Sequence, residues 1–298
     1  MGVLAGKAVV ITGSGRGIGA TVARLAAQEG ASVVVNDIDK AEADKVAAEI
    51  VKAGGKAVAN ASNIGTWDGA RALIENCVDS FGAIDGLVNN AGVYRLGRVD
   101  QVSEKDFRDT MDSNVLGTVF TVRHAAPHMI KRKQGSIVNV TSGAHMGLFG
   151  QSAYGASKGA AASFTYACAL DLREFNIRVN ALSPMAATRM GDQGVDFANS
   201  QGLPPPVLPS PEKNAPVVVY LLSDEARGVN GQIVRIDDKR LSLVTHPGIG
   251  NPVLQRDAGW DVASIAQAFR EELGKRQYPL GVIGLNVQRA ELDITNWK

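Results

Sequence analysis

Several marks of specialised proteins are missing from this sequence. Its 298 residues include only two cysteines, Cys77 and Cys168, which form no CxxC pair, so neither a disulfide framework nor a thiolate metal site is expected. Lys and Arg total 31 against 30 for Asp and Glu, which gives no general field to attract nucleic acid or an anionic membrane. The first apolar run, broken at Thr12, is too short to span a membrane and lacks a signal-peptide layout. We therefore expect a cytoplasmic protein with a local binding site.

Short β-branched runs alternate with longer helical stretches along most of the chain. Seven runs are predicted to be strands: Ala8–Thr12, Ser32–Asn36, Lys56–Asn60, Gly86–Asn89, Ser136–Val140, Ile177–Ala181 and Gln232–Ile236. Their apolar residues are continuous, as in Val33–Val35, which favours strands buried on both faces, and the intervening segments have the length of crossover helices. The pattern predicts an α/β protein with a doubly wound parallel sheet, a Rossmann fold, over residues 1–238.

Two segments depart from this alternation. Residues 185–211 are rich in glycine and proline, and we expect them to form a loop that covers the site as a substrate lid. Residues 239–298 follow the last predicted strand and are expected to be a C-terminal extension packed on the same domain. Within the extension, residues 260–273 carry apolar side chains at helical spacing, with Asp261 as the predicted N-cap.

A glycine-rich turn, Thr12–Gly19, follows the first predicted strand, and a helical pattern begins at Ala20. Glycines in such a turn permit a tight bend, let the backbone approach a pyrophosphate and let the helix pack close to the sheet. The first N–H groups of the helix then lie ready for the anion. Because the turn stands directly between a strand and a helix, it predicts a dinucleotide site.

The end of the second predicted strand bears on which dinucleotide binds. Asp37 stands where a carboxylate can accept hydrogen bonds from both hydroxyls of the adenosine ribose, and it would repel a 2′-phosphate. Arg16, inside the glycine turn, could instead pair with such a phosphate. We give the acidic residue more weight, so NAD is favoured over NADP.

Tyr154 and Lys158 are four residues apart at the start of a predicted helix that runs to about Phe175, so the phenol and the ammonium share one face. A phenol is a poor base near neutral pH, and a nearby cation lowers its pKa by favouring the phenolate. Each unit of lowering requires about 1.4 kcal/mol, which Lys158 and a positive nicotinamide would supply together. Ser142, just after the strand Ser136–Val140, can hydrogen-bond the reacting oxygen.

Five features together resemble the short-chain dehydrogenase/reductase family over residues 7–237. They are Thr12-Gly-x-x-x-Gly-x-Gly19, Asn89-Asn-Ala-Gly92, Asn114, Ser142 and Tyr154-x-x-x-Lys158. The resemblance implies a catalytic tetrad with Tyr154 as general acid/base and with Lys158 lowering its pKa and holding the nicotinamide ribose. Ser142 would orient the substrate oxygen, and Asn114 would anchor a water-linked proton relay.

The resemblance also implies a set of cofactor-binding residues: Gly13, Arg16, Gly17, Ile18, Gly19, Asp37, Ile38, Asn63, Ile64, Asn90, Ala91, Gly92, Tyr154, Lys158, Pro184 and Thr188. Asn89–Gly92 would line the adenosine side of the cofactor, and Thr188 would meet the nicotinamide carboxamide.

Three positions depart from the family pattern. The acidic residue that usually follows the third strand is replaced in Ala61-Ser-Asn-Ile64, where the Asn63 amide could still bond adenine. Pro184 is followed by Met185 instead of glycine. The segment between Ser142 and Tyr154 is one residue short, so Thr141 has the commoner spacing, while Ser142 better matches the strand end.

The leading hypothesis is an NAD-linked enzyme that interconverts a small-molecule secondary alcohol and a ketone. A second is a (3R)-hydroxyacyl-thioester dehydrogenase, because Phe149–Tyr154 and Gly228–Arg235 look like the dehydrogenase part of multifunctional β-oxidation enzymes. A third is a sensor protein that binds the dinucleotide without chemistry, although such proteins usually lose the Tyr or the Lys.

Other residues complete the expected site. His145, Met146, Phe149, Tyr94 and Met190 flank the catalytic loops and could line a largely apolar pocket. His124 and His128 are spaced to share a metal, but no further His or Cys clusters near them in sequence, so we expect no metal.

Association is also expected. Family members commonly use the helices that start near Ser103 and Tyr154, and the small residues of Gly155–Ala162 permit a close helix approach. We therefore expect a homodimer or homotetramer.

Overall fold

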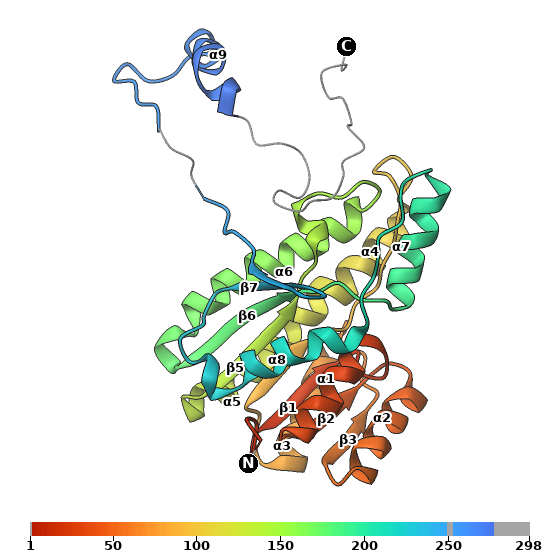
Figure 1. Cartoon of the computed structure of the whole chain (residues 1–298). Helices are drawn as coiled ribbons and strands as arrows, with labels where there is room; N and C mark the ends of the chain where they lie inside the picture. Colours follow the sequence, from red (N-terminus) through yellow and green to blue (C-terminus); the bar gives the residue numbers. More distant parts are fainter. Residues whose placement is uncertain (1, 249–252, 277–298) are drawn as a thin grey trace. The chain divides into compact units, whose positions relative to one another are not determined.

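The structure is a computed structural model that describes residues 2–248 and 253–276, in two units divided between Thr245 and His246 (Figure 1). The first unit contains one sheet with the strand order β3-β2-β1-β4-β5-β6-β7-β8, parallel except for β8. The strands are β1 Ala8–Thr12, β2 Ser32–Asn36, β3 Lys56–Asn60, β4 Gly86–Asn89, β5 Gly135–Val140, β6 Ile177–Ser183, β7 Ile233–Asp237 and β8 Arg240–Leu243. The predicted doubly wound α/β fold is confirmed.

Helices cover both faces of the sheet. In the first unit they are α1 Gly17–Gln28, α2 Lys40–Lys52, α3 Trp67–Phe81, α4 Glu104–Met111, α5 Gly117–Arg132, α6 Ser152–Asp171, α7 Arg189–Ser200 and α8 Ala215–Leu222. Side chains of α1, α2 and α8 form one apolar core with the sheet, and those of α3, α5 and α6 form another.

The apolar strands explain this layering. Val33 and Val35 of β2 lie in the first core and Val34 lies in the second, because successive side chains of a strand point to opposite faces. All three are fully buried, as the continuous apolar run predicts. Because helices cover both faces of the sheet, a ligand cannot bind on either face. Ligand sites of such sheets lie beyond the carboxyl ends of the strands.

A row of buried polar side chains fixes the helices at that edge. Thr121 of α5 donates to Oδ1 of Asn89 (2.6 Å), and Asn89 Nδ2 donates to Oδ1 of Asn139 (2.9 Å). Asn139 Nδ2 in turn donates to Thr165 of α6 (3.0 Å). Because buried polar groups are costly unless paired, this row holds α5 and α6 in one register against β4 and β5.

The long helix predicted from Ser103 is divided in the structure. Ser103 caps α4, which is followed by a π-helical turn at Asp112–Leu116. Helix α5 follows directly and ends at Arg132. The turn has helical dihedral angles at both ends, so a sequence pattern cannot separate it from the flanking helices. It carries Asn114.

The segment 185–211, which was predicted to be a loop, contains helix α7, and that prediction is wrong in this part. Thr188 caps the helix by accepting a hydrogen bond from the Gly191 amide (3.2 Å). Gly191 is required by packing, since a Cβ there would lie 2.8 Å from the backbone carbonyl oxygen of Ala186. This glycine thus serves a close contact of a helix and does not mark a loop.

The predicted domain boundary at 238 falls inside the sheet. Strand β8 pairs antiparallel with β7, and the first unit continues to Thr245. The second unit contains α9 Val262–Glu271, and the predicted cap is confirmed, because Asp261 accepts from the Ser264 amide (2.7 Å). Packing of the extension on the domain stays a prediction, and residues 277–298 lie outside the described residues.

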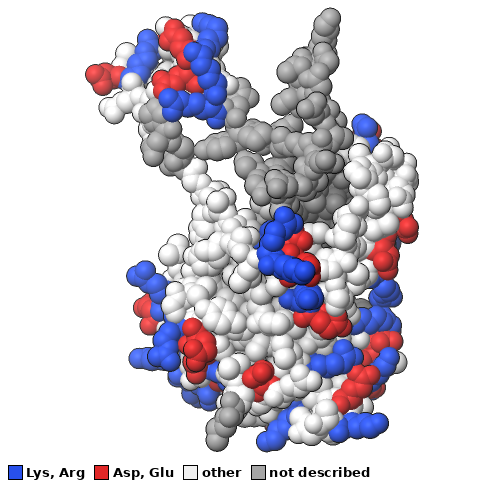
Figure 2. Space-filling view, in the orientation of Figure 1, with Lys and Arg blue, Asp and Glu red and all other residues white. Residues whose placement is uncertain are grey.

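Figure 2 shows the charged side chains of the first unit mainly over the lower part of the face, below a broad uncharged area. Lys and Arg side chains alternate there with Asp and Glu, and no large area carries a single sign. Within residues 2–248 and 253–276, no helix combines the length and apolarity required to cross a membrane.

Candidate active site

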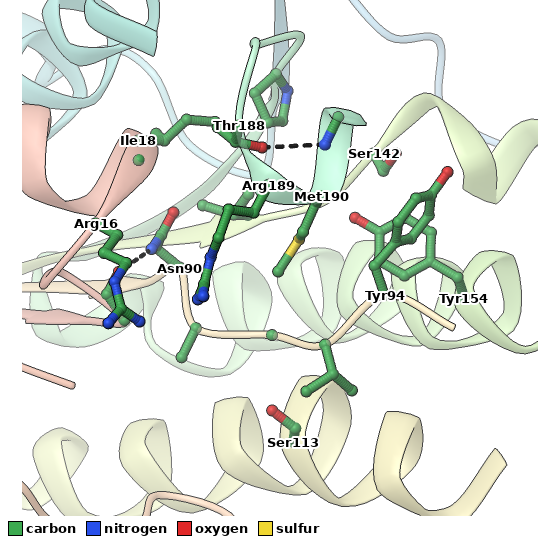
Figure 3. Close-up of a pocket in the computed structure, with 18 of the residues that line it drawn as sticks. Arg16, Ile18, Asn90, Tyr94, Ser113, Ser142, Tyr154, Thr188, Arg189 and Met190 are labelled. Atoms are coloured by element: carbon green, nitrogen blue, oxygen red, sulfur yellow. Dashed lines mark hydrogen bonds between the residues drawn. The ribbon is translucent and has the colours of Figure 1, made fainter. Parts of the chain in front are cut away.

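A cleft of about 1270 Å³ lies at the carboxyl ends of the parallel strands (Figure 3). Most of the residues predicted for the site line it: Gly13, Arg16, Gly17, Ile18, Asp37, Ile38, Asn63, Ile64, Asn90, Ala91, Gly92, Ser142, Tyr154, Lys158, Pro184 and Thr188. Two predicted residues, Gly19 and Asn114, are buried behind its wall. One cavity thus joins the glycine turn to the tyrosine and lysine.

The glycine turn has the conformation that its residues permit. Gly13 and Gly17 have φ angles of +61° and +53°, in the left-handed region that side chains disfavour. A Cβ on Gly13 would lie 2.7 Å from the Cα of Ala91, and one on Gly19 would lie 2.3 Å from the Gly13 carbonyl oxygen. Gly19 therefore acts through packing, by letting α1 approach the turn closely.

Hydrogen bonds join the turn to the loop after β4. The Thr12 hydroxyl accepts from the amides of Asn90 and Ala91, both at 3.0 Å. Asn90 Nδ2 donates to the carbonyls of Thr12 (3.0 Å) and Gly13 (2.9 Å), and Figure 3 shows this side chain at the cleft wall. The two loops form one rigid floor for an extended ligand.

At the far end of this floor, Asp37 and Arg16 have different tasks. Asp37 accepts hydrogen bonds from the amides of Gly15 (3.1 Å) and Asp39 (3.0 Å), which fixes its carboxylate beside the turn. Arg16 pairs with Asp39 (2.6 Å) and Glu42 (3.3 Å). The hydrogen bond from Arg16 lowers the pKa of Asp39 and raises that of the guanidinium. Arg16 is thus committed to neighbouring carboxylates.

Asn63, Ile38 and Ile64 line the same end. The Asn63 side-chain carbonyl accepts from the Gly65 amide (2.9 Å), whereas its NH₂ group has no hydrogen bond to any described residue. Ile38 is 73% exposed and Ile64 only 7%. An aromatic base would meet apolar walls and one amide donor here, which fits an adenine ring.

The catalytic residues meet at the other end of the cleft. Tyr154 and Lys158 lie one turn apart on α6, with the ammonium 5.6 Å from the centre of the phenol ring. Lys158 donates to the carbonyl of Val140 (2.8 Å). Ser142 follows β5 and is hydrogen-bonded to Tyr154.

The competing assignment to Thr141 is disfavoured by its contacts. Its side chain is fully buried, and its hydroxyl donates to the carbonyl of Leu182 (3.0 Å). The Ser142 hydroxyl, which accepts from the Ala144 amide (3.2 Å), keeps its proton for another partner.

Burial opposes the charged forms of both catalytic groups. It raises the pKa of Tyr154, as does the neighbouring Tyr94, while the Ser142 hydrogen bond acts in the other direction. Burial also lowers the pKa of Lys158 to about 8. Lys158 alone therefore does not lower the pKa of the Tyr154 phenol as the sequence predicted. A positively charged ring bound beside the phenol would have to lower it.

Asn114 is buried beneath the cleft and hydrogen-bonds two of the segments that form it. It is 1% exposed and exchanges two hydrogen bonds with the backbone of Val93, accepting from its amide (2.7 Å) and donating to its carbonyl (3.0 Å). Its Nδ2 also donates to Ser157, the residue before Lys158 (3.0 Å). Asn114 thereby couples the loop after β4 to the catalytic helix, and the proton relay stays a prediction.

The loop after β6 contains a contact that sequence reasoning missed. The Met185 carbonyl accepts from Asn214 Nδ2 (3.0 Å), and its sulfur accepts from Arg235 Nη2 of β7 (3.1 Å). Arg235 is 7% exposed and also donates to Ser183 (3.3 Å). Met185, which stands where the family usually has glycine, thus has Arg235 as a buried partner. The two residues meet because β6 and β7 are neighbours in the sheet.

Apolar and aromatic residues surround the phenol. Tyr94 packs edge-to-face on Tyr154 with ring centres 4.6 Å apart, and Met190 projects from α7 (Figure 3). Leu148 and Gln151 also line the cleft, although the sequence did not single them out. His145, Met146 and Phe149, which were predicted for the pocket, are not among its lining residues.

Comparison with known proteins agrees with this arrangement. The family described as short chain dehydrogenase matches residues 7–195. A crystal structure of a short chain dehydrogenase from Mycobacterium avium is 35% identical, with a TM-score of 0.83 over 95% of this chain and 100% of the other. A solved 7α-hydroxysteroid dehydrogenase complexed with NADH and 7-oxo glycochenodeoxycholic acid is 33% identical, with a TM-score of 0.70 over 79% and 94%.

A longer relative aligns with nearly the whole chain. The peroxisomal hydratase-dehydrogenase-epimerase of Neurospora crassa is 35% identical over 290 residues, which is 93% of this chain and 31% of that protein. The similarity to the dehydrogenase part of multifunctional enzymes, inferred from sequence segments, is thereby confirmed.

Gly13 provides a test of the close contact between the two loops. Gly13→Ala should lower the free energy of unfolding by about 3 kcal/mol, because it combines left-handed strain with overlap against Ala91. Gly54→Ala is the matched control, since its φ is +88° but nothing lies within 4 Å, and it should cost about 1 kcal/mol. Urea denaturation measures both, and equal losses would contradict the contact.

Lys158 provides a test of burial. From about pH 8 towards 10.5, the unfolded chain keeps the proton that folded Lys158 has lost, so the free energy of unfolding should rise with pH. Lys158→Met should abolish this rise, whereas Lys45→Met, at an exposed lysine, should retain it. Denaturation series should stop below pH 10.0, where the raised pKa of Tyr154 begins to act in the opposite sense. A rise that survives in Lys158→Met would contradict the account.

Proposed function

The chain belongs to the short-chain dehydrogenase/reductase family, and we propose that it is an NAD-dependent enzyme that interconverts a secondary alcohol and a ketone. One observation carries the proposal: a single cleft contains the glycine turn at one end and Tyr154, Lys158 and Ser142 at the other. The family makes the chain an oxidoreductase. A hydride carrier bound along the floor would bring its ring to the phenol.

In the proposed reaction, the residues of the chain handle the proton and position the substrate. Ser142 and Tyr154 hold the substrate oxygen between their hydroxyl groups. On oxidation, the alcohol O–H bond breaks and its proton passes to Tyr154, while the carbinol C–H bond releases a hydride to leave a carbonyl. A bound nicotinamide supplies the acceptor for that hydride, or the donor in the reverse direction. Lys158 would hold the ribose of the bound carrier beside the phenol.

The charges at the adenosine end support NAD over NADP. Asp37 is placed to accept from ribose hydroxyls, and Asp39 and Glu42 add negative charge. Arg16, the alternative partner for a 2′-phosphate, already pairs with these two carboxylates. A nicotinamide dinucleotide suits the site, and the solved relative complexed with NADH points in the same direction.

Of the two alternative functions, one is supported by a comparison and the other is opposed by the residues of the cleft. A (3R)-hydroxyacyl-thioester dehydrogenase is favoured by the alignment of nearly the whole chain with a hydratase-dehydrogenase-epimerase. Oxidation of such thioesters but not of simple alcohols would select it. A non-catalytic dinucleotide sensor is disfavoured, because Tyr154 and Lys158 are both present and line the same cleft. Small-molecule substrates, a cytoplasmic location and association into homodimers or homotetramers are part of the proposal.

The role of Tyr154 is tested by removal of its hydroxyl. Tyr154→Phe should lower turnover by about a thousandfold, because the proton then has no acid/base partner, while NADH binding measured by fluorescence stays close to that of the wild type. Tyr220→Phe, on α8 and outside the cleft lining, is the control and should keep full turnover. Unaltered turnover in Tyr154→Phe would overturn the assignment.

Cofactor choice is tested at Asp37. The wild type should bind NADH at least about tenfold more tightly than NADPH, since one lost or repulsive charge contact is worth about 1.4 kcal/mol or more. Asp37→Ser should narrow or reverse that ratio by weakening NADH and admitting the 2′-phosphate. Asp44→Ser, which removes an exposed charge on the next helix, should leave the ratio unchanged. A wild type that prefers NADPH would refute the NAD assignment.

A further inference from the structure

We propose that Arg189 is a cofactor-binding residue that holds the pyrophosphate of the dinucleotide from the α7 side of the cleft. The inference rests on the proposed dinucleotide site and adds to it a cation that the cofactor-binding set predicted from the sequence does not include. Arg189 is the first residue of α7, lines the cleft and is exposed. Figure 3 shows its side chain extending from α7 into the cavity.

Arg189 differs from Arg16 and Arg95, which also line the cleft, in its ion pairs. Arg16 is paired with Asp39 and Glu42, and Arg95 is paired with Asp106 (3.2 Å) and Asp109 (3.9 Å). Among the described residues, no carboxylate or other side chain forms an ion pair or hydrogen bond with the Arg189 guanidinium. A cation that extends into a ligand cleft without a protein partner is available for an anion of the ligand.

The position of its neighbours indicates which part of the ligand that anion is. Thr188, the preceding residue, packs on the glycine turn, since a Cβ on Gly17 would lie 3.2 Å from Thr188 Cγ2. The turn is the part of the fold where the backbone can approach a pyrophosphate. In Figure 3 Arg189 lies between Arg16, at the adenosine end, and Met190, which projects nearer to Tyr154. The pyrophosphate of an extended dinucleotide would lie between those two ends.

The charge balance of the cleft makes such a cation valuable. Asp37, Asp39 and Glu42 place three carboxylates near the turn, and in the described part of the chain Arg16 is the one cation that pairs with any of them, with Asp39 and Glu42. A dinucleotide adds two further negative charges at its phosphates. The amides at the start of α1 can offset part of this charge, and a guanidinium adds bidentate, charge-assisted hydrogen bonds.

Helix α7 connects Arg189 with the substrate end of the cleft. Met190, the next residue, lines the cleft, and Gly194 on the same helix lies close to Tyr94, whose hydroxyl would be 3.4 Å from a Cβ there. Contact between Arg189 and the cofactor would therefore hold α7, and with it part of the substrate wall. Bound dinucleotide should slow amide hydrogen exchange in α7 through this residue.

Binding of cofactor fragments tests the proposal without relying on turnover. Arg189→Gln should weaken both NADH and ADP-ribose by about tenfold to a hundredfold, because both contain the pyrophosphate, and should leave adenosine unchanged. Arg189→Lys should restore part of the affinity. NADH fluorescence gives the first constant, and displacement of NADH gives the other two. The NADH-induced protection of α7 should be lost in Arg189→Gln.

Arg173→Gln is the matched control. Arg173 is exposed, lies in the turn between α6 and β6 away from the cleft lining, and has no ion pair within the described residues. It removes the same charge, and its affinities should equal those of the wild type. Thermal unfolding of both variants should match the wild type, since each side chain is exposed.

The other outcomes are distinguishable. A wild type that fails to bind NADH and NADPH would refute the proposed function itself. Normal NADH and ADP-ribose affinities in Arg189→Gln, with a wild type that binds well, would overturn the role of Arg189 alone. An equal loss for adenosine would also overturn it, since it would indicate a general disturbance. A loss confined to NADPH would assign Arg189 to the 2′-phosphate and contradict the pyrophosphate contact.

Discussion

The close approach of two backbone loops is the constraint on which the rest of this site depends. Gly13 stands against Ala91 with no room for a side chain, and Asn90 closes the gap by donating to the carbonyls of Thr12 and Gly13. Because the two loops end neighbouring parallel strands, they form one floor only if β1 and β4 keep their register. Asn114 then extends this floor to the catalytic helix through Val93 and Ser157. The glycine turn and the phenol are thus parts of one framework.

Burial gives the chemical end its electrostatic character. Tyr154 and Lys158 are both disfavoured in their charged forms, and the ammonium is held by a single carbonyl, that of Val140. A site of this kind responds strongly to any charge placed beside it, because little water is present to screen the interaction. At the adenosine end the charged groups are only partly buried, and Arg16 pairs with Asp39 and Glu42. The cleft therefore has partly exposed charged groups at one end and strongly desolvated ionisable groups at the other.

Much of this arrangement could be predicted from the sequence, for a physical reason. Strands buried on both faces are rich in apolar residues, and glycine at a left-handed φ or a close contact has no substitute, so β1, β2, β4, β5, β6 and the turn leave plain signals. The helix α7 was missed because it contains two glycines, of which Gly191 is there for a close backbone contact with Ala186 that the sequence pattern does not reveal. Strand β8 was missed because all four of its residues are exposed. The pairing of Arg16 and the contact of Met185 with Arg235 depend on elements that only the fold brings together.

In the proposed function the cleft transfers a hydride as well as binding a dinucleotide. The most direct measurement follows an isotope from the cofactor to a product. The protein is incubated with NADH that carries deuterium at C4 of the nicotinamide ring and with a panel of ketones, and the alcohols are analysed by mass spectrometry. The account predicts deuterium at the carbinol carbon of at least one product, from one face of the ring. Tight NADH binding with no deuterated alcohol from ketones or from 3-oxoacyl thioesters would contradict it.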